Sequence, residues 1–145
     1  MTLLKRIPLL SSFTRYLTST RGDMVEGVIV LPLMALIALA LVNLSLAGYA
    51  SVTANNAANV AARVASVAQS DPVGQGMAAA QHALQAGIGE YDVALAAPSS
   101  PGGQVTATVS WRVPNFFGGL LRIFGAGSGD VISGQAVAVF RKEGW

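Results

Sequence analysis

The stretch "RGDMVEGVIVLPLMALIALALV", Arg21–Val42, decides how this chain is organised. Two acids, Asp23 and Glu26, stand near its start, and most of the residues after them are aliphatic. The uncharged part extends over Val28–Tyr49, which is about 33 Å long as a helix and matches a hydrocarbon core of roughly 30 Å. The Leu, Ile and Val residues of the quoted stretch favour membrane insertion by about −3 to −6 kcal/mol in sum. We therefore expect a transmembrane helix.

The charges before this helix predict its orientation. Lys5, Arg6, Arg15 and Arg21 precede any acid in the chain. Positive residues favour the cytoplasmic side, so we expect a cytoplasmic N-terminus and an extracytoplasmic remainder. Pro32 removes one helical hydrogen bond and predicts a kink, which membrane helices tolerate.

The alternative to a retained anchor is a secretory signal peptide. Residues Ser45–Ala47 have the small-x-small pattern of a cleavage site. However, the polar head and the apolar stretch are both long, and helical character continues past the site. These features favour the anchor.

An alanine-rich segment, Gly48–Gln69, extends the helix beyond the membrane. Alanine has the highest helix propensity, and Asp71 followed by Pro72 predicts an end near residue 70. Small residues recur at spacings of about three and four along one helix face, which allows close backbone approach. This face packs on the chain's own soluble domain, on neighbouring subunits, or on both along different parts of the helix. Its members are Ala50, Ala54, Ala57, Ala61, Ala65 and Ala68.

The remaining sequence predicts a short helix and three strands. Gln75–Ala86 has helical spacing, whereas Tyr91–Ala97 and Gln104–Val113 alternate apolar and polar residues. The third strand, Val131–Arg141, is apolar in both registers, consistent with burial on both sides or with a bulge near Gly134. Such a small sheet buries little alone, so we expect the outer half of the long helix to complete its core.

An apolar segment, Pro114–Asp130, separates the last two strands. Five large apolar residues in it follow helical spacing, although Gly118 and Gly119 weaken helicity. It is either a short helix that caps the sheet, a contact with the membrane surface, or a subunit interface.

The composition argues against catalysis, nucleic-acid binding and metal binding. The chain has no cysteine, one histidine (His82) and a net charge of only +2. Nucleophilic catalysis lacks a base, and nucleic-acid binding lacks a basic surface. A Ca²⁺ site at Asp71 or Asp130 would lack the dense oxygen ligands of a calcium loop. We expect no enzyme activity, no cofactor, no metal and no small-molecule substrate.

The two acids have a local explanation as well as a functional one. If the helix begins near Asp23, then Asp23 and Glu26 have the spacing of a capping box, and their charge suits the helix dipole. An unpaired carboxylate at membrane level is otherwise costly.

The sequence also resembles a known family. A basic leader that ends in glycine, a nearby glutamate, an early "LP" and the continuation "NNAANVAARVA" resemble the TadE-like proteins, minor pilins or pseudopilins of tight-adherence pilus systems. The resemblance implies that a prepilin peptidase cuts between Gly22 and Asp23. It also implies that Glu26 pairs with the new α-amino group of a neighbouring subunit and sets subunit registration. Family members usually carry this glutamate at the fifth mature position, and Glu26 would be the fourth.

Together these observations predict an α+β fold, in which a long N-terminal transmembrane α-helix continues into a small antiparallel-sheet domain of the pilin type. We expect a cytoplasmic leader (1–22), a membrane helix (23–49), its extracytoplasmic continuation (50–70) and a small α+β domain (71–145). The expected function is that of a single-pass membrane protein in assembly of a type IV-like adhesion pilus or a related secretion apparatus, with other pilin-type subunits as partners. The alternative is a membrane-tethered accessory or scaffold protein outside the filament.

Overall fold

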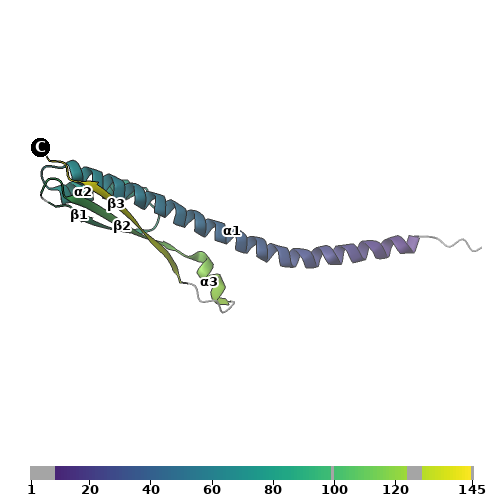
Figure 1. The fold of residues 1–145 in the computed structure, drawn as a ribbon. Helices are drawn as coiled ribbons and strands as arrows, with labels where there is room; N and C mark the ends of the chain where they lie inside the picture. The colour runs from purple at the N-terminus through teal and green to yellow at the C-terminus, as the bar shows by residue number, and fades with distance from the viewer. Residues whose placement is uncertain (1–8, 99, 124–128, 145) are drawn as a thin grey trace, which may run out of the picture. The chain divides into compact units, whose positions relative to one another are not determined.

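The chain has an α+β fold with three helices and three strands in its described part, as expected (Figure 1). The computed structural model describes residues 9–98, 100–123 and 129–144, so residues 1–8 of the predicted leader lie outside it. The elements are α1 (Leu9–Val67), α2 (Pro72–Leu84), β1 (Glu90–Ala96), β2 (Gln104–Pro114), α3 (Phe116–Ile123) and β3 (Val131–Arg141).

Helix α1 has 59 residues and begins earlier than the capping pattern predicts. Asp23 lies inside the helix, whereas an N-cap residue has non-helical backbone. The capping-box interpretation of Asp23 and Glu26 is therefore wrong. The sequence between Leu9 and Asp23 contains no proline that would stop the helix. The helix also continues through Pro32.

The chain divides into two compact units, Met1–Ala38 and Leu39–Trp145. In the first unit, the described residues belong to α1, and the aliphatic side chains whose exposure is described, from Met24 onward, are largely exposed. The segment Glu26–Val67 is long and apolar enough to cross a membrane, judged by its length and composition. Exposed aliphatic side chains are unfavourable in water and favourable in lipid, which supports membrane anchoring through the first part of this segment.

In the second unit, a sheet with strand order β1-β2-β3 is antiparallel throughout. The predicted strands agree with the observed ones to within a residue at each end. On β2, the apolar residues at alternate positions are buried and the intervening polar ones are not. Alternation with period two therefore located the strands because one face of the sheet is packed and the other faces outward.

Strand β3 departs from both alternatives that its sequence offered. It lies at an edge of the sheet, and Val137 and Val139 on its outer face are more than half exposed. Its pairing with β2 continues without interruption, so it has no bulge at Gly134. Gly134 instead pairs with Trp111, and a Cβ atom there would come within 2.5 Å of the indole ring. The glycine makes room for the tryptophan on the neighbouring strand.

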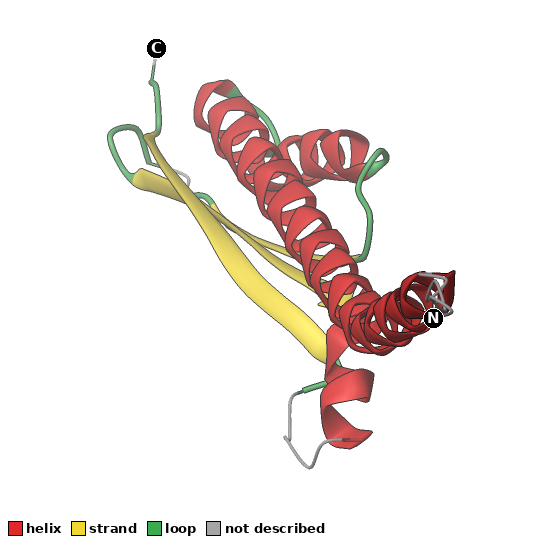
Figure 2. Cartoon of the chain, turned by 90° about the vertical axis from the view of Figure 1, so that its right-hand side faces the viewer, coloured by secondary structure: helices red, strands yellow, loops and turns green. Residues whose placement is uncertain are grey.

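The core lies between one face of this sheet and the C-terminal part of α1, which crosses the sheet in Figure 2. Alanines from the helix meet valines from the central strand, of which Val105, Val109 and Val113 are fully buried. The prediction that the outer half of the helix completes the core of the sheet is confirmed. Alanine provides both helix propensity and a thin side chain, so the helix backbone comes close to the strand.

Helix α2 packs beside the same part of α1 (Figure 2). Its N-cap residue is Asp71, whose Oδ1 atom accepts a hydrogen bond from the Gly74 amide at 3.0 Å. At Gly76, a Cβ atom would come 2.9 Å from the Ala61 carbonyl oxygen and 2.5 Å from a methyl group of Leu95. The absence of a side chain at this glycine is therefore required for the approach of α2 to α1.

A larger side chain on the alanine face should destabilise the domain. Ala61 is fully buried, so Ala61→Leu should lower the free energy of unfolding by about 1–3 kcal/mol, because the added atoms have no room. Asn56→Leu, at an exposed position of the same helix, should change it by less than about 0.5 kcal/mol. Chemical denaturation in detergent, followed by circular dichroism, measures both. Equal effects would contradict close packing at Ala61.

Candidate functional site

A polar cluster joins α1 to the start of α3. Asn43 is only 5% exposed, and its Nδ2 atom donates to the Oδ1 atom of Asn115 at 2.7 Å. Its Oδ1 atom accepts from the Phe116 amide at 3.2 Å. Asn115 Oδ1 also accepts from the Gly118 amide at 3.0 Å, so two free amides at the start of α3 are satisfied. We call Asn43 and Asn115 the asparagine junction.

The junction extends to the segment that leads into β3. Asn115 donates through its Nδ2 atom to the Gly129 carbonyl at 2.8 Å, and its backbone amide donates to the Asp130 carbonyl at 2.9 Å. Arg122, near the end of α3, forms an exposed ion pair with Asp130 at 2.7 Å. Such an exposed pair contributes little stability, so the asparagine junction is the main polar tie between α3 and α1.

No role was assigned to Asn43 from the sequence alone. An asparagine that follows a long aliphatic run is a usable signal, because a polar side chain there requires a partner. The identity of the partner was not readable, since Asn115 lies 72 residues later in the chain.

Removal of Asn43 should weaken this tie. Asn43→Ala removes the acceptor of the part-buried Phe116 amide and one of the two donors to Asn115 Oδ1, and the free energy of unfolding should fall by about 1–3 kcal/mol. Hydrogen exchange at the Phe116 amide should become faster. Asn59→Ala, at an exposed asparagine whose amide donates only to the Asn55 carbonyl one turn earlier, is the matched control and should change stability by less than about 0.5 kcal/mol. Unchanged exchange at Phe116 in Asn43→Ala would contradict the junction.

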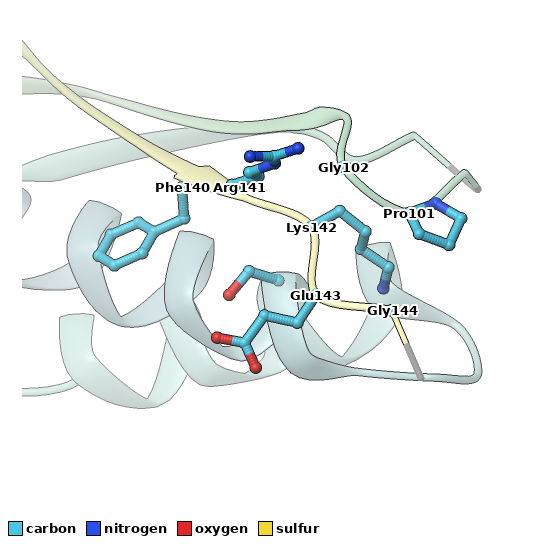
Figure 3. A pocket seen from close by; sticks show the side chains of 8 residues that line it. Pro101, Gly102, Phe140, Arg141, Lys142, Glu143 and Gly144 are labelled. Carbon is cyan, nitrogen blue, oxygen red and sulfur yellow. The ribbon is translucent and has the colours of Figure 1, made fainter.

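At the opposite end of the sheet, the segment after β3 closes onto the end of α1 (Figure 3). Lys142 is buried, and its ammonium group donates to the carbonyl oxygens of Ala65, at 3.2 Å, and Ala68. The Glu143 amide donates to the Ser66 carbonyl at 2.9 Å. A cation at a helix C-terminus is favourable, because the last carbonyls carry partial negative charge. The hollow beside these residues is thus a structural closure, with its lysine already engaged.

The three residues expected to govern processing and registration lie in the first unit. Gly22, Asp23 and Glu26 are all helical residues of α1. Glu26 is exposed. Among the side chains that the structure describes, the ion pair found is the one between Arg122 and Asp130, so Glu26 forms none with them. The Glu26 carboxylate is thus placed where another molecule could reach it.

The alanine face of α1 lies in the second unit, unlike Gly22, Asp23 and Glu26. All six alanines expected to pack the helix are buried; five of them belong to the core of the second unit, and Ala68 lies just after the end of α1 at Val67. The chain's own sheet already covers this face, which corresponds to the first of the three alternatives. A neighbouring subunit would therefore meet a different side of α1. The residues concerned are Ala50, Ala54, Ala57, Ala61, Ala65 and Ala68.

The titratable groups of the second unit do not converge on a catalytic arrangement. His82 is exposed on α2, and no group of three or more possible metal ligands occurs among the described residues. Asp71 caps α2 and Asp130 pairs with Arg122, so each carboxylate has a structural role. Burial raises the pKa of Tyr91 above its ordinary value of 10.0, and its phenol donates a hydrogen bond to the Ile88 carbonyl.

Comparison with known proteins gives one match. Residues 24–63 match the family model of the TadE-like proteins. The search of curated proteins and the search of solved structures each found no match to this chain. The matched segment includes Glu26, the exposed aliphatic part of α1, Asn43 and most of the alanine face. The resemblance to the TadE-like family is therefore confirmed over residues 24–63.

Proposed function

We propose that this protein is a membrane-anchored minor pilin or pseudopilin that acts in assembly of a tight-adherence pilus. In this proposal, residues 1–22 form a cytoplasmic leader, 23–49 the membrane helix, 50–70 its continuation and 71–145 the extracytoplasmic domain. The role is mechanical and interfacial. Other pilin-type subunits are the partners, and the protein is stored in the membrane before it joins or primes a filament.

The observation that carries this proposal is the change of surroundings along α1. Before Asn43 the helix exposes aliphatic side chains, and from Ala50 onward the same helix lies in a protein core. The match to the TadE-like family covers both parts. A subunit that is held in lipid by one part of a helix and folded around the other can be transferred between membrane and filament without refolding its domain.

Glu26 is the residue that we propose for subunit registration. Its carboxylate is exposed near the start of the aliphatic part of α1. In a medium of low dielectric, an unpaired carboxylate is costly, and a hydrogen-bonded cation removes that cost. The α-amino group of a neighbouring subunit that has been cut after Gly22 would supply this cation. The pairing would then select one axial position between the two helices.

Removal of the Glu26 carboxylate should separate assembly from insertion. Glu26→Ala should abolish copurification with partner pilins, and the protein should still resist extraction from membranes by alkaline carbonate. Glu26→Asp keeps the charge and should retain part of the assembly. Glu90→Ala, at an exposed glutamate of β1, is the control and should assemble normally. Normal copurification of Glu26→Ala would show that this carboxylate does not register subunits.

The leader gives a second test, which concerns processing. If a prepilin peptidase acts between Gly22 and Asp23, mass spectrometry of the membrane and sheared-pilus fractions should find Asp23 as the first residue. Gly22→Leu should block the cut and leave the leader attached, because the small residue before the bond is replaced. A membrane form that keeps Met1 in the wild-type chain would overturn processing and favour the accessory protein.

Two other functions predict different products. A tethered accessory or scaffold protein of a secretion system needs the same anchor and domain, keeps its leader and does not enter sheared filaments. A secreted protein released after Ala47 would begin at Gly48. That cleavage would remove Asn43, which is the acceptor of the Phe116 amide and one of the two donors to Asn115 Oδ1, and this loss makes the product unfavourable.

A further inference from the structure

We propose that α3 lies in the lipid headgroup region, at the surface where α1 leaves the membrane. This inference rests on the membrane anchoring in the proposed function and deepens it, because it identifies a second lipid contact in the folded domain. The contact would fix the level of the domain relative to the bilayer while the subunit is stored there.

The asparagine junction sets the position of α3 along α1. Hydrogen bonds from Asn43 reach both Asn115 and the Phe116 amide, so the first turn of α3 lies beside Asn43. Figure 1 shows α3 at the end of β2, where the chain turns back into β3. The level of Asn43 in the membrane therefore decides the level of α3.

The burial of α1 places Asn43 at the membrane boundary. The chain's own domain covers Asn43 and Ala50, and Ala47 between them is partly buried against the core. Lipid therefore cannot surround the helix there. The preceding segment, Met24–Val42, is about 28 Å long as a helix, which matches a hydrocarbon core of roughly 30 Å. The helix thus leaves the lipid near Asn43, before the predicted boundary at Tyr49, and Glu26 lies at the opposite edge of the bilayer.

The composition of α3 fits the boundary between lipid and water. Its sequence is "FFGGLLRI", and Phe116 is 53% exposed although it stands next to the junction. Val131, at the start of β3, is exposed to the same extent. Arg122 keeps its charge in solvent, paired with Asp130. Aromatic and aliphatic side chains with a nearby arginine are typical of interfacial helices.

Spin labels can measure this contact in the full-length protein. The chain has no cysteine, so a single cysteine can carry a nitroxide at a chosen position. We would place it at Phe116 (Phe116→Cys) and, independently, at Val131 (Val131→Cys). Val137→Cys, on the outer face of β3, is the water-exposed control, and Leu33→Cys, within the aliphatic part of α1, is the lipid control. Each variant is reconstituted into phosphatidylcholine–phosphatidylglycerol vesicles, and circular dichroism confirms that it is folded.

Power saturation compares how often the nitroxide collides with oxygen, which concentrates in lipid, and with a nickel chelate, which is soluble in water. The proposal expects the oxygen-to-nickel ratio at Phe116 and Val131 to exceed that at Val137 several-fold, and to fall below that at Leu33. If the ratio at Leu33 is that of a lipid-exposed label but the ratios at Phe116 and Val131 equal that at Val137, then α3 lies in water. This result overturns the inference and leaves the membrane anchor intact. If a label is shielded from both reagents, a protein partner covers α3, which also overturns it. If Leu33 itself reads as water, the anchoring in the proposed function fails.

Discussion

The close packing of the alanine face of α1 on β2 is the contact on which the rest of the structure depends. Three strands cannot bury enough apolar surface by themselves, and the valines of β2 need a partner that fits against the strand. Alanines of the helix supply that partner, and Gly76 lets α2 approach the same place. Because the core requires this part of α1, the folded domain stays attached to the helix that carries the exposed aliphatic segment.

This constraint explains why a single asparagine is placed where the surroundings of α1 change. Before Asn43 the side chains of the helix are apolar and exposed, and after it the helix is covered by protein. A polar side chain at this position is satisfied by Asn115 and by the first turn of α3. At the other end, Lys142 binds the last carbonyls of the helix. The sheet is thus tied to α1 at both of its ends, with alanine packing between them.

Much of this fold was predictable, because its signals are local. Alternation located β1 and β2, an apolar run located β3, and the alanine-rich run followed by Asp71 and Pro72 located the end of α1 within a few residues. The start of α1 was not predictable from Asp23 and Glu26, since the same pair occurs inside a helix as readily as at its first turn. The edge position of β3 depends on which strands pair, and an apolar edge resembles a buried strand in sequence. The asparagine junction joins residues far apart in the chain, so the sequence indicated that Asn43 needs a partner but not that Asn115 is this partner. In the candidate site, Glu26 was found from a family resemblance, and the fold shows only that it is accessible.

The placement of the alanine face also limits how subunits could assemble. A face buried in the chain's own core is not available to a neighbour, so in the proposed assembly close helix contacts between subunits would use other sides of α1, among them the exposed aliphatic side chains of the segment Met24–Val42. Each large aliphatic side chain moved from lipid to water costs about 1.5–3 kcal/mol, and that segment contains many of them. A single subunit would therefore not leave the membrane alone. Under the proposed function, transfer into a filament would become favourable only when neighbouring helices replace the lipid around this segment as it moves. The same replacement would surround Glu26 with protein, where a carboxylate without a cation is most costly, so extraction and ion pairing would have to occur together.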